Sequence, residues 1–163
     1  MVYKSKISHP LTNVVISAKE CCGEIVLTGI ELSGSGTDHT GGAGTHKTVE
    51  IYGKMICRFL DGKSQDLSSI PLDFENFTNF SKKVLQAARL IKSGETVSYE
   101  QLSSMAGYPG ATRAAASVMR KNRYPLVIPC HRVIRKDGST GGYCGIQQGA
   151  AVELKKKLLE MER

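Results

Sequence analysis

A cysteine and a histidine stand side by side in VIPCHRVI, residues 127–134 of the chain. A free thiol has a pKa of about 8.5, so a nucleophilic cysteine needs a base or a positive charge beside it at neutral pH. His131 is the candidate base for Cys130, and Arg132 adds positive potential. Adjacent side chains on a strand point to opposite sides, but Pro129 favours a turn or a strand edge, where both could reach one pocket. Cys130 is therefore either a nucleophile that His131 helps to ionise or an inert thiol of the core.

Basic residues are concentrated around this pair. Residues 111–136 contain Lys and Arg side chains but no Asp or Glu, and the whole chain of 163 residues has a formal net charge of +7. Such a stretch is typical either of a solvated basic surface or of a surface that binds a polyanion such as nucleic acid. The charge distribution alone leaves both interpretations open.

The first third of the chain favours short strands followed by a helix. Alternating apolar and polar residues with many β-branched side chains predict strands at residues 4–8, 13–17 and 24–32. An apolar stripe over residues 49–60 predicts a helix, which Asp-Gly-Lys ends. Residues 34–45 are rich in Gly and Thr and are expected to form a disordered connector.

From about residue 77 the pattern changes to amphipathic helices. Residues 77–94 carry an apolar stripe with helical spacing, and Gly94 suits the position just after a helix end. The members of this stripe are Phe80, Val84, Leu85, Ala88, Leu90 and Ile91. A second amphipathic pattern covers residues 150–163. We therefore expect an α/β domain at residues 1–76, a small antiparallel sheet plus a helix, and a mostly helical domain at residues 77–163.

Two short helices joined by a tight turn are predicted inside the second domain. Ser98 followed by Gln101 is a capping-box pattern, GYPG at residues 107–110 is a turn, and residues 111–122 are strong helix formers. This is the helix-turn-helix arrangement of DNA-binding proteins, although ordinary helical bundles contain the same hairpin. A face of small side chains on the second helix fits either close, weakly sequence-selective contact with DNA or a packed core helix. That face comprises Ala111, Ala114, Ala115, Ala116 and Ser117.

Composition limits the compartment and the cofactors. The five cysteines are an odd number, and the N-terminus lacks the apolar segment of a secretory signal, which predicts a reducing, cytoplasmic or nuclear location. No apolar run approaches the roughly 20 residues of a membrane span, so no membrane association is expected. Cys21, Cys22, Cys57, His39 and His46 lack the spacing of zinc ligands, so no metal and no cofactor are expected.

The surroundings of Cys130 resemble the O(6)-alkylguanine-DNA alkyltransferases, suicidal repair proteins also called methylated-DNA–protein-cysteine methyltransferases. The strings that carry the resemblance are VSYEQLSSMAG, TRAAASVMRKN, IPCHRVI and GGYCG, in that order. The likeness is dense from Phe80 to Tyr143 and looser from Leu158 to Glu162. The first third matches only in general character, as a small strand-rich domain.

The resemblance implies four catalytic residues. Cys130 would take the alkyl group from O(6) of guanine in one irreversible transfer, and His131 would draw off the thiol proton through a bound water. Glu162 would orient and polarise the histidine, with Glu160 as the alternative because the segment before the last helix is longer than usual in the family. Tyr99 would donate a hydrogen bond toward guanine N3 and press the 3′ phosphate. The product thioether is not hydrolysed, so each molecule would act once.

The resemblance also implies the contacts to double-stranded DNA that contains alkylated guanine. Arg113 would enter the duplex in place of the flipped guanine and offset part of the unstacking cost. Further DNA contacts are expected from Ser98, Thr112, Ala114 and Arg120. The base would be bound by Tyr99, Asn122, Val133, Tyr143, Cys144 and Gly145. Cys144 stands where the family usually carries a small residue such as serine, and the protein is expected to be a monomer.

Two further departures from the family pattern concern the second of the paired helices. Arg123 stands where a proline often follows Asn122, which would loosen the turn or add a phosphate contact. Ala116 and Ser117 replace glycines, which would hold the helix slightly further from DNA.

Three functions are compatible with these features. The first is the repair alkyltransferase. The second is a non-catalytic lesion binder of the alkyltransferase-like type, but such proteins lack the acceptor cysteine, and the presence of Cys130 argues against it. The third is a helix-turn-helix DNA-binding regulator without alkyl transfer, which would bind undamaged DNA in a sequence-specific way.

Overall fold

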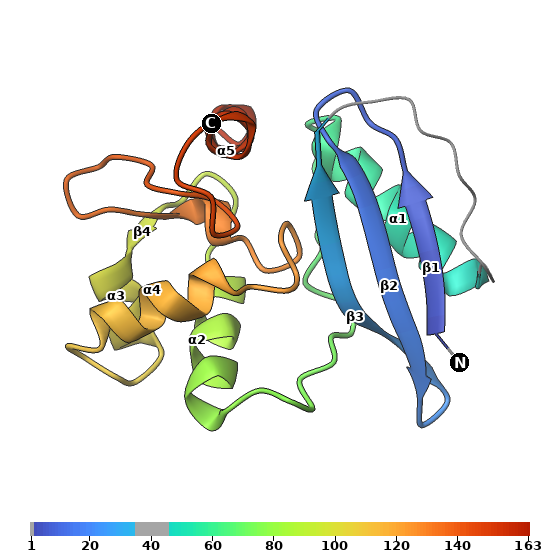
Figure 1. Cartoon of the computed structure of the whole chain (residues 1–163), viewed down its shortest axis with the longest axis horizontal. Helices are drawn as coiled ribbons and strands as arrows, with labels where there is room; N and C mark the ends of the chain where they lie inside the picture. The colour runs from blue at the N-terminus through green and yellow to red at the C-terminus, as the bar shows by residue number, and fades with distance from the viewer. Residues whose placement is uncertain (1, 35–45) are drawn as a thin grey trace. The chain divides into compact units, whose positions relative to one another are not determined.

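The computed structural model describes residues 2–34 and 46–163 (Figure 1). The chain divides into two compact units, Met1–Asp73 and Phe74–Arg163, and the sequence pattern placed this division between residues 76 and 77. Phe74 belongs with the second unit because its ring packs on Tyr124, with 6.0 Å between the ring centroids. Apart from Gly34, the connector expected at residues 34–45 lies outside the described residues.

The first unit is a small antiparallel sheet with one helix. Strands β1 (Val2–Ile7), β2 (Asn13–Cys21) and β3 (Glu24–Ser33) pair in the order β1-β2-β3, and helix α1 (Lys47–Leu60) packs against β1 and β2 (Figure 1). Alternate residues of β2 are fully buried against the helix side, as the period of a half-buried strand requires. A side chain at Gly53 of α1 would place its Cβ 2.9 Å from Ile7, so glycine allows the helix to lie close to β1. The predicted small sheet plus helix is confirmed.

The second unit consists mainly of helices. Its elements are α2 (Asn79–Arg89), β4 (Val97–Ser98), α3 (Tyr99–Met105), α4 (Thr112–Arg120), the 3₁₀ turn η1 (Cys130–Arg132), β5 (Val133–Ile134) and α5 (Ala150–Met161). Helices α2, α3 and α4 pack on one another, and α5 packs on η1. The two short strands β4 and β5 pair in parallel, so Tyr99 at the start of α3 is held close to the segment that follows Cys130.

The predicted capping box is present at the start of α3. The Ser98 hydroxyl accepts a hydrogen bond from the Gln101 amide at 3.1 Å, and the Gln101 side chain accepts one from the Ser98 amide at 2.7 Å. These two bonds satisfy amides that a helix start otherwise leaves unpaired. Because Ser98 is also the last residue of β4, the cap fixes the change from strand to helix immediately before Tyr99.

Two predictions about α2 are wrong. The helix ends at Arg89 with Leu90 as its cap residue, so Gly94 does not follow the helix end directly. Gly94 instead has a φ of +81° in the turn that the Glu95 amide closes onto the Lys92 carbonyl. Leu90 was expected in the apolar stripe but is 76% exposed, because the chain has left the helix there.

The small residues of α4 do not share one face, contrary to the sequence interpretation. Ala115 is fully buried in the core, whereas Ala114 and Ser117 are exposed and Ala116 is half-buried. With 3.6 residues per turn, consecutive positions point in different directions. One side of the helix therefore packs in the core and another side is open to solvent, and contact of the open side with DNA stays a prediction.

Candidate active site

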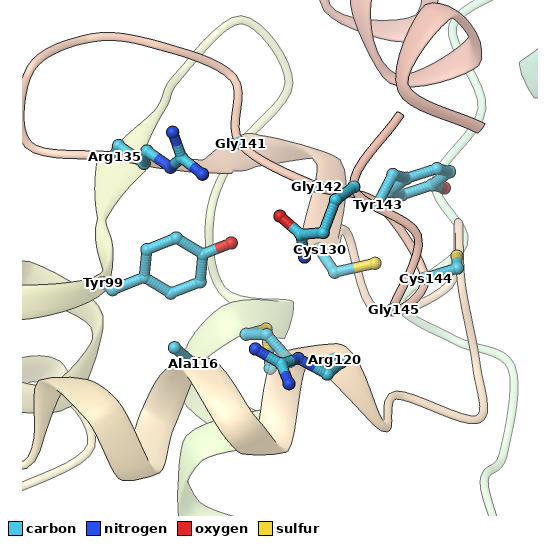
Figure 2. Close-up of a pocket in the computed structure, with 12 residues that line it drawn as sticks. Tyr99, Ala116, Arg120, Cys130, Arg135, Gly141, Gly142, Tyr143, Cys144 and Gly145 are labelled. Atoms are coloured by element: carbon cyan, nitrogen blue, oxygen red, sulfur yellow. The ribbon is translucent and has the colours of Figure 1, made fainter. Parts of the chain in front are cut away.

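A cavity of about 250 Å³ lies in the second unit, and Cys130 is part of its wall (Figure 2). Tyr99 comes from α3, while Ala116, Met119 and Arg120 come from α4. The remaining wall is formed by Arg135, Gly141, Gly142, Tyr143, Cys144, Gly145 and Gln147, which lie in the segment between β5 and α5. Figure 2 shows the Tyr99 hydroxyl directed into the pocket, with Cys144 on the other side in this view.

The 3₁₀ turn separates the two reactive side chains of the Cys-His pair. The Cys130 amide donates to the Ile128 carbonyl at 2.7 Å and the Arg132 amide to the Pro129 carbonyl at 2.9 Å, which closes a tight turn after Pro129. The predicted turn is present, but it does not bring both side chains into the pocket. Cys130 lines the cavity, whereas His131 is fully buried and reaches Glu162 near the C-terminus.

His131, Arg132 and Glu162 form a buried cluster behind the pocket. His131 Nε2 lies 3.1 Å from Glu162 Oε1, and Arg132 donates to the same carboxylate from Nη2 at 2.6 Å and from Nε to Oε2 at 2.9 Å. Burial tends to raise the pKa of Glu162, but the hydrogen bonds from His131 and Arg132 outweigh it and lower that pKa to about 2. Burial also lowers the pKa of His131, although Glu162 opposes the change, so the imidazole is neutral at neutral pH. A neutral imidazole is the form that can accept a proton.

The structure shows which of two carboxylates, Glu162 or Glu160, contacts His131. Glu162 is the C-cap residue of α5, and its side chain is 6% exposed beside His131. Glu160 lies in the last turn of α5 and is exposed to solvent. The carboxylate that contacts the histidine is therefore that of Glu162.

Lys155 is a buried cation that sequence reasoning missed. Its side chain is fully buried, and Nζ donates to the carbonyls of Val133 at 2.7 Å and Gly142 at 3.3 Å. Burial lowers the pKa of Lys155 to about 8, although the two pocket thiols oppose the change. The sequence carries a signal for this burial, because Lys155 precedes Leu158 by three residues and so occupies the apolar side of α5.

Several groups together favour the thiolate form of Cys130. The pKa of the Cys130 thiol is lowered by a hydrogen bond from Cys144, against the opposing effect of burial, and further by the Asn122 side chain and the charge of Lys155. Asn122 also donates to the Ile128 carbonyl at 3.2 Å and accepts from the Tyr124 amide at 3.0 Å. Asn122 thus holds the chain between α4 and the 3₁₀ turn and positions the thiol at the same time.

Cys144 projects from a two-residue turn in the pocket wall. The amide and carbonyl of Tyr143 bond reciprocally to those of Ile146, at 2.8 and 2.9 Å. Cys144 and Gly145 lie between them with φ values of 48° and 82°. Tight turns of type I′ require positive φ at both central residues, which costs free energy for any residue other than glycine. This turn places Cys144 in the wall of the cavity that Cys130 also lines (Figure 2).

The structure brings together some of the predicted contact residues and leaves others outside the pocket. Arg120, Tyr143, Cys144 and Gly145 line the cavity with Tyr99 and Cys130. Ser98, Thr112, Arg113 and Ala114 are not part of its wall, and Val133 is fully buried, with its carbonyl bonded to Lys155. Arg113 is exposed on α4, and residues 113, 116 and 120 lie at the spacing of one helix face that leads to the pocket.

Arg123, which departs from the family pattern, has a packing partner in the structure. Its guanidinium lies over the Phe77 ring, 5.9 Å from the centroid. A cation over an aromatic face is a favourable contact. The residue therefore stabilises the segment that follows α4.

Two findings concern metals and membranes. Within residues 2–34 and 46–163, no three His, Cys, Asp or Glu side chains gather closely enough to hold a metal ion. His39, one of the ligands considered from the sequence, lies outside the described residues. Among the helices of the described ranges, none combines the length and the apolar character that crossing a membrane requires.

A cysteine whose surroundings lower its pKa, in a pocket beside a pair of packed helices, is typical of the class of proteins that use a cysteine as a nucleophile. Residues 79–163 match the family model described as 6-O-methylguanine DNA methyltransferase, DNA binding domain. The chain belongs to this family.

Named relatives agree with that assignment. The chain is 46% identical over 107 residues to a methylated-DNA–protein-cysteine methyltransferase of Methanothermobacter thermautotrophicus, which covers 66% of this chain and 57% of the relative. The match thus spans little more than half of that relative. The crystal structure of Mycobacterium tuberculosis O6-methylguanine methyltransferase superposes with a TM-score of 0.74 at 25% identity, covering 99% of this chain and 93% of that one. The crystal structure of Mycobacterium tuberculosis OGT in complex with DNA superposes with a TM-score of 0.74 at 26% identity, covering 98% of this chain and 92% of that one.

Proposed function

We propose that this protein is a single-turnover methyltransferase that repairs DNA by moving an alkyl group from O(6) of guanine to its own Cys130. The observation that carries the proposal is the thiol itself, which lines a cavity of about 250 Å³ while its contacts lower its pKa. An inert core cysteine would have neither an adjacent cavity nor these contacts. Membership of the methyltransferase family supports the same reading.

The chemistry is a direct displacement at the alkyl carbon. The Cys130 sulfur forms a bond to that carbon, the bond from carbon to O(6) breaks, and its electron pair stays on the guanine. The leaving base then needs a proton or a hydrogen-bond donor. Tyr99 is the donor, because burial and the neighbouring Cys130 raise the pKa of its hydroxyl, so it stays protonated at neutral pH.

His131 removes the proton from the thiol before the transfer. The neutral imidazole accepts the proton through an intervening water, and the Glu162 carboxylate stabilises the imidazolium that forms. Arg132 holds this carboxylate through its other contacts. Glu162 is therefore a positioning residue, which acts on the thiol through the histidine.

Helices α3 and α4 act as a helix-turn-helix that binds double-stranded DNA. The exposed Arg113 and the pocket residue Arg120 stand two turns apart on α4, so one helix face can follow the DNA toward the cavity. A guanine stacked in a duplex cannot reach Cys130, so it must be flipped out, with Arg113 filling the vacated space. Ser98, Thr112 and Ala114 contact the backbone beside it.

The flipped base is bound by the pocket wall. Tyr143, Cys144 and Gly145 contact it from one side, and Asn122 and Val133 support the wall from beneath. The protein acts as a monomer in a reducing compartment, cytoplasmic or nuclear, which keeps Cys130 reduced. Residues 77–163 carry the chemistry and the DNA contacts, and residues 1–76 form a structural domain.

Titration with a labelled duplex separates this function from the alternatives. DNA that contains O(6)-methylguanine with a radioactive methyl group is mixed with increasing amounts of protein, and the label on protein and on DNA is counted. We expect label to move to protein until about one methyl group is bound per molecule, with no further turnover. Cys130→Ala should abolish transfer, and Cys57→Ala in the first unit should retain it.

Two outcomes would contradict the proposal. Tight binding of the damaged duplex without movement of label would indicate a lesion binder. Preference for one undamaged sequence over methylated DNA, again without transfer, would indicate a regulator.

A further inference from the structure

The pocket contains a second thiol beside Cys130. Cys144 comes from the turn fourteen positions later in the chain, both side chains line the same cavity, and each thiol shifts the pKa of the other. In Figure 2 the Cys130 sulfur points to the side of the pocket where Cys144 lies. The remaining cysteines, Cys21, Cys22 and Cys57, lie in the first unit.

The two thiols differ in how readily they ionise. Their contacts lower the pKa of Cys130, while the bond to Cys130 and burial raise the pKa of Cys144. The lower-pKa thiol is the one that reacts first with an oxidant, since the thiolate is the reactive form. The interaction with the Cys130 thiolate is what raises the pKa of Cys144 most, so oxidation of Cys130 removes that effect and allows Cys144 to ionise and attack the oxidised sulfur in a second step.

We propose that Cys130 and Cys144 form a reversible disulfide when the pocket meets a peroxide, with Cys144 as the resolving cysteine. The Cys130 sulfur attacks one peroxide oxygen, the O–O bond breaks, and a sulfenic acid and one water form. The Cys144 sulfur then attacks the Cys130 sulfur, the S–S bond forms, and the S–O bond breaks to release a second water. Both sulfurs are oxidised by one electron each, and the peroxide is reduced by two.

The local backbone permits the approach that the disulfide needs. A disulfide needs its two sulfurs about 2.05 Å apart, so one of the two thiols that line the cavity must move toward the other. Cys144 and Gly145 are the central residues of a turn held by two backbone bonds between Tyr143 and Ile146, and Gly141 and Gly142 precede this turn. We expect these glycines to let the turn shift toward Cys130 without movement of a helix.

The consequence for repair rests on the proposed function. A sulfur in a disulfide is no longer a nucleophile, so the oxidised protein would not accept an alkyl group until a thiol reductant releases Cys130. Without Cys144 the sulfenic acid would be oxidised further to the sulfinic acid, which ordinary reductants do not reverse. Cys144 thus protects an acceptor that can be used only once.

A peptide map tests the bond without any DNA. The full-length reduced protein is treated with hydrogen peroxide, its free thiols are blocked with iodoacetamide, and it is digested with trypsin. Cleavage after Arg123, Arg132, Lys136 and Lys155 puts Cys130 in peptide 124–132 and Cys144 in peptide 137–155. We expect these two peptides joined, lighter than their sum by two hydrogen atoms and separated again by dithiothreitol. Peptide 124–132 carrying only sulfinic acid, or joined to another cysteine, would overturn the proposal.

Variants and a recovery assay complete the test. In Cys144→Ser the joined peptides should vanish and sulfinic acid should accumulate on Cys130, whereas Cys57→Ser should match the unaltered protein. Methyl acceptance is measured after peroxide followed by dithiothreitol and is expressed as a fraction of the same protein's untreated value. We expect this fraction to be about tenfold lower in Cys144→Ser than in the unaltered protein. Equal recovery in all three would contradict a protective role. If untreated protein accepts no methyl group, the proposed function fails, and the peptide map still decides whether the disulfide forms.

Discussion

At the scale of single residues, the ionisation of Cys130 depends on groups that are distant in the sequence. The thiol is influenced by Cys144, Asn122 and Lys155, which come from a loop, a helix end and the last helix. The motif around Cys130 was sufficient to predict a turn after Pro129, and the roles of Cys130 and His131 stay predictions. It did not indicate Lys155, whose position on the apolar side of α5 is only a weak signal of burial, because a lysine in an amphipathic helix is usually solvated.

Replacing Lys155 with methionine tests the electrostatic part of this account. The substitution keeps an unbranched side chain and removes the charge, so the pKa of Cys130 should rise. Each unit of increase lowers the thiolate fraction near neutral pH by about tenfold. The measurement is the rate of iodoacetamide reaction with Cys130 across pH, which should show a midpoint shifted upward. Lys156→Met is the matched control, because Lys156 is exposed and pairs with Glu153. An unchanged midpoint in Lys155→Met would show that the charge does not act on the thiol.

At the scale of elements, Glu162 at the end of α5 contacts His131 and Arg132 of the 3₁₀ turn. The sequence pattern predicted the helix and the capping box of α3 because both depend on neighbours within one turn of helix. It misplaced the end of α2 and the faces of α4, because these depend on what packs against each helix. The choice between Glu162 and Glu160 likewise needed the position of α5 relative to His131.

Acid should weaken the fold through Glu162. Its pKa is lowered from 4.5 to about 2 in the folded protein, so the ionised carboxylate stabilises the fold above about pH 4.5. This contribution should be lost as the pH falls through about 2. Glu162→Gln should therefore lower the free energy of unfolding by about 3 kcal/mol at pH 7, because it leaves Arg132 without its partner. The free energy of unfolding of this variant should also change less with pH in acid. Urea unfolding at several pH values measures both effects, with the exposed Glu160→Gln as the control. Equal stability of the two variants would contradict the ion-pair account.

Helix α4 carries the proposed duplex contact, and Arg113→Ala tests it. If Arg113 replaces the flipped base, its loss should slow methyl transfer from duplex DNA by about tenfold or more, corresponding to about 1.4 kcal/mol or more. Reaction with the free O(6)-methylguanine base needs no flipping and should change less than about twofold. Single-turnover rates on both substrates provide the comparison. Equal slowing on both would mean that Arg113 acts on the pocket rather than on the duplex.

At the scale of the whole molecule, every wall residue of the pocket belongs to the unit Phe74–Arg163. The sequence allowed a close prediction of this unit, because the motifs around Cys130 and Tyr99 are specific and lie near one another along the chain. The first unit was predicted by its strand pattern alone, which gives a small sheet but no function. The shared cavity of Cys130 and Cys144 could not be predicted, since a glycine-rich segment between them allows many paths.

The central claim is that one alkyl group ends on one particular sulfur. The most direct measurement is mass spectrometry of the tryptic peptides after reaction with duplex DNA that contains O(6)-methylguanine. We predict a single added methyl group on Cys130, in peptide 124–132, reaching one per molecule, and none in Cys130→Ser. A methyl group on Cys144 or another cysteine, or transfer that persists in Cys130→Ser, would contradict the account.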